Sequence, residues 1–103
     1  MASSKEYLNF ILDQLSEAEE VSYRPMMGEY LIYCRAKLIG GIYDDRFLVK
    51  PTKSAAAMMP HAEHESPYDG AKAMLLVDHV DDKAFLRMLT EAICADLSDA
   101  KSE

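Results

Sequence analysis

The sequence predicts an α+β fold, a five-stranded and mainly antiparallel sheet with helices packed on one face. Two observations predict this class. Apolar residues recur at helical spacing near both ends of the chain, whereas residues 21–50 are rich in Val, Ile, Tyr and Leu without that spacing. A length of 103 residues fits a single domain, 1–103, with one buried core.

Residues 3–17 are expected to form the first helix. Ser3 and Glu6 have the spacing of a capping box, in which each side chain satisfies a free N–H group of the other residue. The apolar stripe that follows has three- and four-residue steps and consists of Tyr7, Leu8, Ile11 and Leu15.

Four strands are expected next, near residues 21–24, 29–35, 37–43 and 46–50. Pro25 cannot donate to a ladder, so the first strand should end there or lie at an edge. Gly28 is expected to permit a bend before the second strand. Arg35-Ala36 and Asp44-Asp45 are the natural two-residue turns, although Ala tolerates positive φ poorly.

The second half should add a short helix, a loop, a buried strand and a final helix. The first three cover residues 53–59, 61–71 and 74–77. Thr52 can cap the short helix, and Asp81 or Asp82 can cap the final one. Residues 98–103 are expected to form a frayed tail.

Two-residue turns would pair Tyr33 with Leu38 and Ile42 with Phe47, which divides the strands into two faces. The face expected beneath the helices holds Leu31, Tyr33, Leu38, Gly40, Ile42, Phe47 and Val49. The opposite face then holds Tyr30, Ile32, Cys34, Lys37, Ile39, Gly41, Tyr43, Arg46, Leu48 and Lys50. Both faces are apolar at the centre, and three helices should cover only one.

An apolar centre with a polar rim is typical of a partner surface. The sequence therefore predicts a homodimer or regulatory protein contact through Arg24, Tyr30, Ile32, Ile39, Tyr43, Arg46 and Leu48. The alternatives are that a helix or loop covers this face, or that the register slips.

Few residues have the type and spacing of a catalytic or metal-binding site. His61 and His64, with Glu63 and Glu65, form the one metal-like cluster, so a small-ligand or metal-binding domain using the 61–70 loop is the alternative function, with a solvated loop as the default interpretation. His79 with Asp78 or Asp81 could act in an enzyme, but a titrating surface histidine explains it better. We therefore expect no enzyme activity, no cofactor and no metal, and assign no catalytic residue.

The net charge of −7 makes direct nucleic-acid binding an unfavoured function, although residues 21–55 carry six basic and three acidic side chains. An apolar run of ~20 residues, as a membrane helix needs, is absent from the sequence. The N-terminus lacks the apolar region of a signal peptide, so a cytoplasmic location is expected. Cys34 and Cys94 should then stay reduced as small buried residues.

An ordered set of residues carries a family resemblance over most of the chain. It comprises Arg24-x-Met26-x-Gly28-x-Tyr30, Leu31-x-Tyr33-Cys34-x-x-Lys37-Leu38-x-Gly40, Arg46-x-x-x-Lys50, Pro67-Tyr68 and the closing helix. The chain resembles a stand-alone N-terminal domain of the bacterial TfoX/Sxy competence regulators, with Ala36 where that family often has glycine. The resemblance implies a secretion-chaperone-like α+β fold that often dimerises. It also implies a non-enzymatic role in regulating competence genes, with a transcription regulator such as the cyclic-AMP receptor protein as partner.

Overall fold

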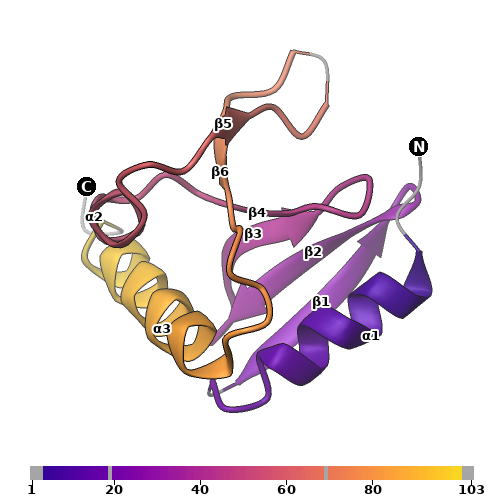
Figure 1. Cartoon of the computed structure of the whole chain (residues 1–103), viewed down its shortest axis with the longest axis horizontal. Coiled ribbons are helices and arrows are strands. Elements are labelled where there is room, and N and C mark those ends of the chain that lie inside the picture. The colour runs from indigo at the N-terminus through magenta and orange to yellow at the C-terminus, as the bar shows by residue number, and fades with distance from the viewer. Residues whose placement is uncertain (1–3, 19, 69, 101–103) are drawn as a thin grey trace.

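The computed structural model describes residues 4–18, 20–68 and 70–100, with only the backbone at residues 99 and 100. Within this part the chain forms an α+β fold in which an antiparallel sheet of six strands packs against helices (Figure 1). The strand order is β1-β2-β3-β4-β6-β5. The predicted class and the antiparallel sheet are confirmed, and the sheet has one strand more than expected.

In the chain, the β1–β4 meander comes between α1 and α2, and strands β5 and β6 come between α2 and α3. Their bounds are Lys5–Gln14 for α1, Val21–Met26 for β1, Glu29–Cys34 for β2, Lys37–Ile42 for β3, Phe47–Val49 for β4, Lys53–Met58 for α2, His64–Glu65 for β5, Met74–Leu76 for β6 and Lys83–Ala100 for α3. Among the described residues, no helix combines the length and the apolar character that crossing a membrane requires.

Helix α1 is shorter than the predicted 3–17. Its N-cap is Ser4, whose Oγ accepts a hydrogen bond from the Tyr7 N–H at 3.1 Å. Ser3, the expected capping residue, lies outside the described residues. At the other end, the buried Gln14 side chain donates from Nε2 to the Val80 carbonyl at 3.0 Å. This contact ties the end of α1 to the segment that precedes α3.

Three hairpins of the meander close through two-residue turns with positive φ at both positions. The turn residues are Met27-Gly28, Arg35-Ala36 and Asp44-Asp45. Positive φ at both positions gives a turn whose twist matches that of the flanking strands. The predicted turns at 35–36 and 44–45 are confirmed. At 27–28, where the sequence indicated only a bend, the chain makes a third tight turn.

The pairing of β2 with β3 contains a bulge at Ile39. Next to the turn, Tyr33 pairs with Leu38, as predicted, but Ile32 pairs with Gly40. Ile39 is therefore an extra residue with no partner of its own, and the register beyond it moves by one position. Because successive side chains of a strand alternate between faces, this single insertion changes which side chains of β2 and β3 lie on each face of the sheet.

The bulge makes the predicted division of faces wrong for β2 and the start of β3. Ile32, Cys34 and Ile39 are buried in the core with the helices, whereas Leu31, Tyr33 and Leu38 belong to the opposite side. Beyond the bulge the prediction is confirmed. The residues that it placed correctly beneath the helices are Ile42, Phe47 and Val49.

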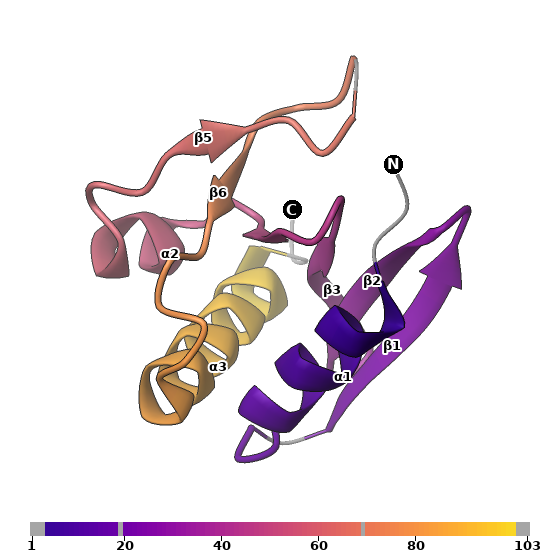
Figure 2. The same cartoon turned by 45° about the vertical axis from the view of Figure 1, so that its right-hand side comes forward.

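Helices α1 and α3 lie on the same side of the sheet (Figures 1 and 2). These helices, with Leu15 at the C-cap of α1, contribute the core residues Leu8, Ile11, Leu15, Leu86, Leu89, Ile93 and Cys94. Helix α3 follows Asp82, whose Oδ1 accepts a hydrogen bond from the Phe85 N–H at 3.1 Å, as predicted for its cap. The helix continues to Ala100 and so includes the first residues of the expected tail, 98–100. Residues 101–103 lie outside the described part.

The short helix α2 confirms the prediction for residues 53–59 within one residue. Thr52 caps it, because its Oγ1 accepts a hydrogen bond from the Ala55 N–H at 3.3 Å. A second anchor comes from α3. The carboxylate of Asp96 accepts hydrogen bonds from the Ser54 N–H at 2.7 Å and from the Ser54 hydroxyl at 2.9 Å. The start of α2 is thereby held against α3.

Strand β6 is the predicted fifth strand, and it pairs with β4 through Leu48 and Leu76. The additional strand β5 lies in the segment 61–71 that the sequence indicated to be a loop. Glu65 of β5 forms an ion pair with Arg46, the residue before β4. The connection from β5 to β6 extends away from the sheet on the side opposite α1 and α3 (Figure 1).

Candidate functional site

The side of the sheet that faces away from α1 and α3 keeps apolar side chains partly exposed to solvent. Leu31, Tyr33 and Leu38 lie on it, and all three retain accessible surface. Arg24 is exposed and pairs with Leu31 across β1 and β2. We call Arg24, Leu31, Tyr33 and Leu38 the open-face strip. Its apolar residues are ones that the sequence predicted to lie beneath the helices.

The predicted exposure of Ile32, Ile39 and Leu48 is wrong. Each of these side chains is 0% exposed, and Tyr43 is 6% exposed. Ile32 and Ile39 lie beneath the helices because of the bulge. Leu48 pairs with Gly41 on the open side, yet this chain's own residues enclose it. None of the three isoleucine and leucine side chains can therefore contact a partner in the folded protein.

The other predicted contact residues are not gathered in one patch either. Tyr30 stands on the helix side, where its ring packs edge-on against Tyr23 with centroids 6.0 Å apart. Arg46 is ion-paired with Glu65, and its Nε donates to the Tyr43 carbonyl at 3.1 Å. Arg46 therefore fastens β5 to the end of the β3–β4 turn. Arg24 alone of the predicted set belongs to the open-face strip.

A pocket of about 420 Å³ lies next to the strip and shares Leu38 with it. Three segments far apart in the sequence form it: β3 with the residue that follows it, the β4–α2 connection, and the β5–β6 connection with the first residue of β6. The lining residues are Leu38, Gly40, Tyr43, Lys50, Pro51, Thr52, Pro67, Tyr68, Ala71, Lys72, Ala73 and Met74. We call this the β5–β6 pocket. Its walls are mostly apolar, as in many small-molecule sites.

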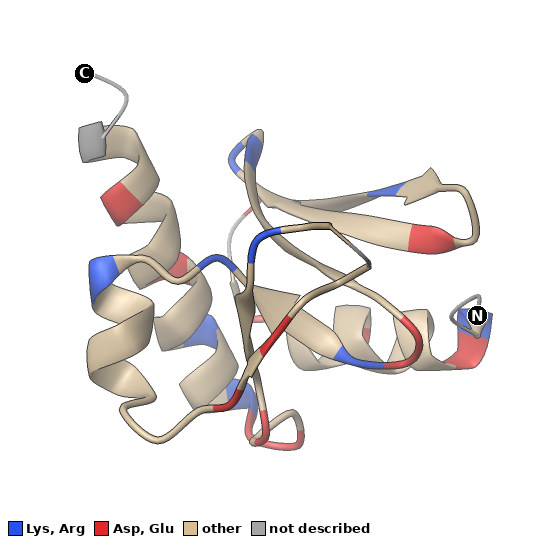
Figure 3. Ribbon diagram, turned by 90° about the horizontal axis from the view of Figure 1, so that it is seen from above, with Lys and Arg blue, Asp and Glu red and all other residues tan. Residues whose placement is uncertain are grey.

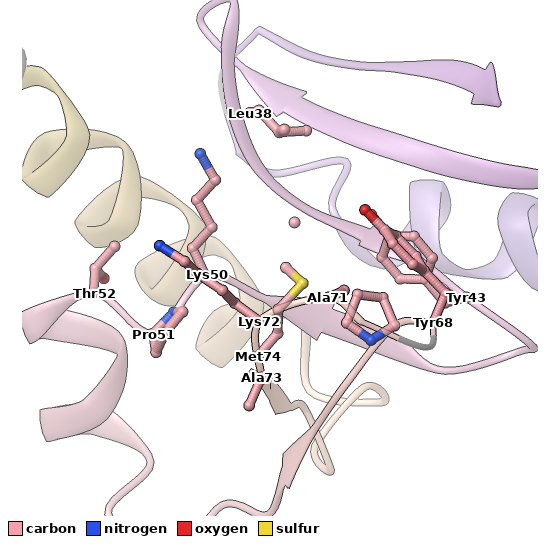
Figure 4. A pocket seen from close by; sticks show the side chains of 12 residues that line it. Leu38, Tyr43, Lys50, Pro51, Thr52, Tyr68, Ala71, Lys72, Ala73 and Met74 are labelled. Carbon is pink, nitrogen blue, oxygen red and sulfur yellow. The ribbon is translucent and has the colours of Figure 1, made fainter.

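The polar groups of the β5–β6 pocket lie at two sides of it. In Figure 4, Lys50 and Lys72 extend on one side, the rings of Tyr43 and Tyr68 stand on the other, and Met74 lies between them. Burial raises the pKa of the Tyr43 phenol above its usual 10.0, and the charge of a nearby Tyr68 phenolate would raise it further. The Tyr43 hydroxyl therefore stays protonated at neutral pH and can donate a hydrogen bond.

Basic and acidic side chains are both distributed over the helices and the strands. Figure 3 shows both signs on the helices as well as on the strands and turns. Several carboxylates have structural partners: Asp82 and Asp96 bind the starts of helices, and Asp45 accepts a hydrogen bond from the Ser4 N–H at 2.8 Å. The pocket lining contributes Lys50 and Lys72 as its charged residues.

The histidines do not gather a metal-binding set in the part of the chain that is described. No group of three or more His, Cys, Asp or Glu side chains has suitable geometry there. His61 and His64 are exposed, and Glu65 is engaged by Arg46. The ring of His79 packs edge-on against Phe85 with centroids 5.8 Å apart. The segment 61–70 instead contributes Pro67 and Tyr68 to the β5–β6 pocket.

Comparison with known proteins identifies one informative relative. No family model matches the chain, and no solved structure matches it significantly. The sequence is 34% identical over 84 residues to an uncharacterised 12.7-kDa protein of the trpE 5′ region in Spirochaeta aurantia, covering 82% of this chain and 73% of the relative. The chain belongs to the family of that protein. A stretch of 84 residues in a chain of 103 must include residues 20–84, and hence the described strands and α2.

The sequence indicated the 61–70 loop as an alternative ligand site, but through His61 and His64. It did not single out Tyr68, Lys72 and Met74 as members of a site. They come together because the β5–β6 connection lies beside β3, a tertiary contact without local signal. One cue was present in the sequence. The segment 61–71, expected to be a solvated loop, contains Pro67, Tyr68 and Ala71, and apolar side chains such as these are expected to pack against other residues.

Proposed function

We propose that this protein is a non-enzymatic regulatory domain that acts by binding another protein. One observation carries the proposal: the sheet has a partly exposed apolar strip on the side that no helix covers within the described residues. A strip of aromatic and aliphatic residues edged by arginine has the composition of protein-binding surfaces. Tyr33 and Arg24 belong to residue types that are enriched among the dominant contacts of protein interfaces.

The sequence resemblance to the N-terminal domain of TfoX/Sxy competence regulators supports a regulatory role. We propose that the partner is a transcription regulator, and that homodimer formation through the same strip is the competing use of this surface. Four charged side chains have structural roles, which favours a binding function over catalysis. Asp82 and Asp96 hold helix starts, and Arg46 and Glu65 hold each other.

The contact residues of the proposal differ from those predicted from sequence. We retain Arg24 and replace the buried Ile32, Ile39 and Leu48 by residues of the open-face strip. Leu31 and Leu38 are the sharpest test positions, because both are apolar, partly exposed and on the same side of the sheet. Gln at either position keeps the approximate size and removes the apolar contact.

An affinity purification from bacterial extract tests this function. The bait is either the wild-type chain, the Leu31→Gln/Leu38→Gln variant, or a control with Met27→Gln in the first turn, which is 97% exposed. We expect a transcription regulator to bind the wild type and the control but not the strip variant. Its equal recovery with all three baits would contradict the proposal. Sedimentation of the three proteins reports whether the strip instead joins two copies.

A further inference from the structure

We propose that the β5–β6 pocket is a binding site for a small organic anion with a flat, apolar body. The site adjoins the open-face strip and shares Leu38 with it, but its occupancy does not depend on the proposed regulatory function. It deepens the ligand-binding alternative for the 61–70 loop, because Pro67 and Tyr68 contribute to it. The histidines of that loop play no part in it.

Size and wall composition favour a small-molecule ligand. A volume of about 420 Å³ falls within the range of roughly 300–1,000 Å³ that is usual for such sites. Leu38, Met74 and two alanines form much of the wall and offer apolar surface without competing hydrogen-bonding groups. Tyr43 is 6% exposed and therefore fixed in place, while Tyr68, 61% exposed, supplies the more accessible of the two aromatic side chains. Flat aromatic bodies pack favourably on such rings.

The charge of the pocket lining determines which charge the ligand should carry. Lys50 and Lys72 extend on the same side of the pocket, and the described lining contains no acidic side chain (Figure 4). In the described part of the chain, no carboxylate lies within ion-pair distance of either lysine. Two ammonium groups beside an apolar wall attract a carboxylate or a sulfonate and repel a cation. Lys50 is partly buried, which strengthens its attraction for an anion.

The two sides of the pocket together specify an amphipathic ligand. A molecule that places its anionic group near Lys50 and Lys72 directs the rest of its body past Met74 toward the tyrosines (Figure 4). The protonated Tyr43 hydroxyl can donate to an additional acceptor on that body. The chemical class that fits is an aromatic carboxylate, with the acid and the ring at opposite ends.

A matched set of probes tests the proposal. We would titrate the protein with 2-naphthoate, with the neutral 2-naphthamide and with the cationic 2-naphthylmethylamine, and follow amide chemical shifts by NMR. Saturable binding of the naphthoate, with the largest shifts at Leu38, Lys50 and residues 71–74, is expected. The amide should bind about tenfold more weakly, because it lacks the charge-assisted contacts, and the amine should not saturate.

Two variants control for non-specific attraction. Lys50→Gln/Lys72→Gln should weaken naphthoate binding by about tenfold or more, while Lys83→Gln/Arg87→Gln, which removes the same charge from α3, should leave it unchanged. Unchanged dispersion of the NMR spectrum verifies that each variant is folded. Equal affinity for the three probes, loss of binding in the α3 control, shifts centred outside the pocket, or no saturable binding would each overturn the proposal.

Discussion

The ring of Tyr43 lies over Gly41, two residues earlier in the chain. A Cβ atom at position 41 would come within 2.8 Å of the ring carbon Cε2 and within 2.8 Å of the Tyr30 carbonyl oxygen. Glycine is therefore required at this position by close packing rather than by its backbone angles. The contact also fixes Tyr43 as a wall of the β5–β6 pocket.

We predict that Gly41→Ala lowers the free energy of unfolding by about 1–3 kcal/mol, because the ring and the neighbouring strand must both move. Gly40→Ala should cost more, since a Cβ there would meet only backbone, including Cα of Val49 at 2.8 Å and the Leu48 carbonyl oxygen. Urea unfolding of the two variants measures both effects. A Gly41→Ala protein as stable as the wild type would show that Tyr43 does not occupy this position.

Ala36 is expected to be a weak point of the β2–β3 turn. Its φ of 66° lies in the left-handed region, where a Cβ atom is unfavourable and glycine is not penalised. Ala36→Gly should raise the free energy of unfolding by roughly 0.5–1 kcal/mol, which is the relief of strain less the greater flexibility of the unfolded chain. Ala73→Gly, at a residue without positive φ, is the control and should lower stability. A loss of stability in both variants would contradict the turn geometry.

The hydrogen bonds between Ser54 of α2 and Asp96 of α3 stabilise the fold to a degree that depends on pH. Hydrogen bonds from the Ser54 backbone and hydroxyl hold the pKa of the Asp96 carboxyl below its usual 3.8. A group with a lowered folded-state pKa stabilises the protein above its unfolded pKa, and this contribution is lost as the pH falls below that value. Asp96→Asn should therefore reduce stability at neutral pH and lessen the loss of stability below pH 3.8.

Thermal unfolding of the wild type and Asp96→Asn between neutral pH and pH 3 measures this dependence. Asp13→Asn is the control, because Asp13 is 70% exposed and its ion pair with Lys83 is 3.7 Å long. Its unfolding curve should follow that of the wild type closely. Parallel pH profiles for the wild type and Asp96→Asn would contradict the proposed capping role.

The two cysteines should be unreactive in the folded protein. Burial and, to a lesser extent, the adjacent Cys94 together raise the pKa of the Cys34 thiol to about 11. The Cys94 Sγ donates to the Cys34 carbonyl at 3.3 Å, and both residues are buried. Because both thiols are buried, and because the raised pKa of Cys34 leaves little of its reactive thiolate, alkylation at pH 8 should be slow for both until the chain is unfolded. Mass spectrometry after iodoacetamide treatment, with and without urea, measures this; rapid labelling of the native protein would refute it.

The sequence predicted those parts of the fold that local chemistry determines. The turns at Arg35-Ala36 and Asp44-Asp45 follow from strand lengths, and the caps at Thr52 and Asp82 follow from side-chain oxygens just before helices. Strand β5 could not be predicted, because two residues carry too little pattern and pair only in the presence of β6.

The assignment of the open face failed at a single residue. Ile39 is a good strand former, and nothing in its neighbourhood signals a bulge, since Gly40 and Gly41 are explained equally well by close packing. Once it is inserted, strict alternation carries Leu31 and Tyr33 to one side and Ile32 to the other. The predicted exposed residues of β2 were therefore wrong, although the turns at both ends of β3 were predicted correctly.

The most direct test of this account compares Leu31→Gln with Ile32→Gln, neighbours in β2 on opposite faces. The free energy of unfolding is measured for each in urea. We predict that Ile32→Gln costs about 3 kcal/mol or more, because it buries an amide in the core, whereas Leu31→Gln costs about 1 kcal/mol or less. Equal costs, or a greater cost at Leu31, would mean that the bulge at Ile39 is absent and that the open-face strip does not exist.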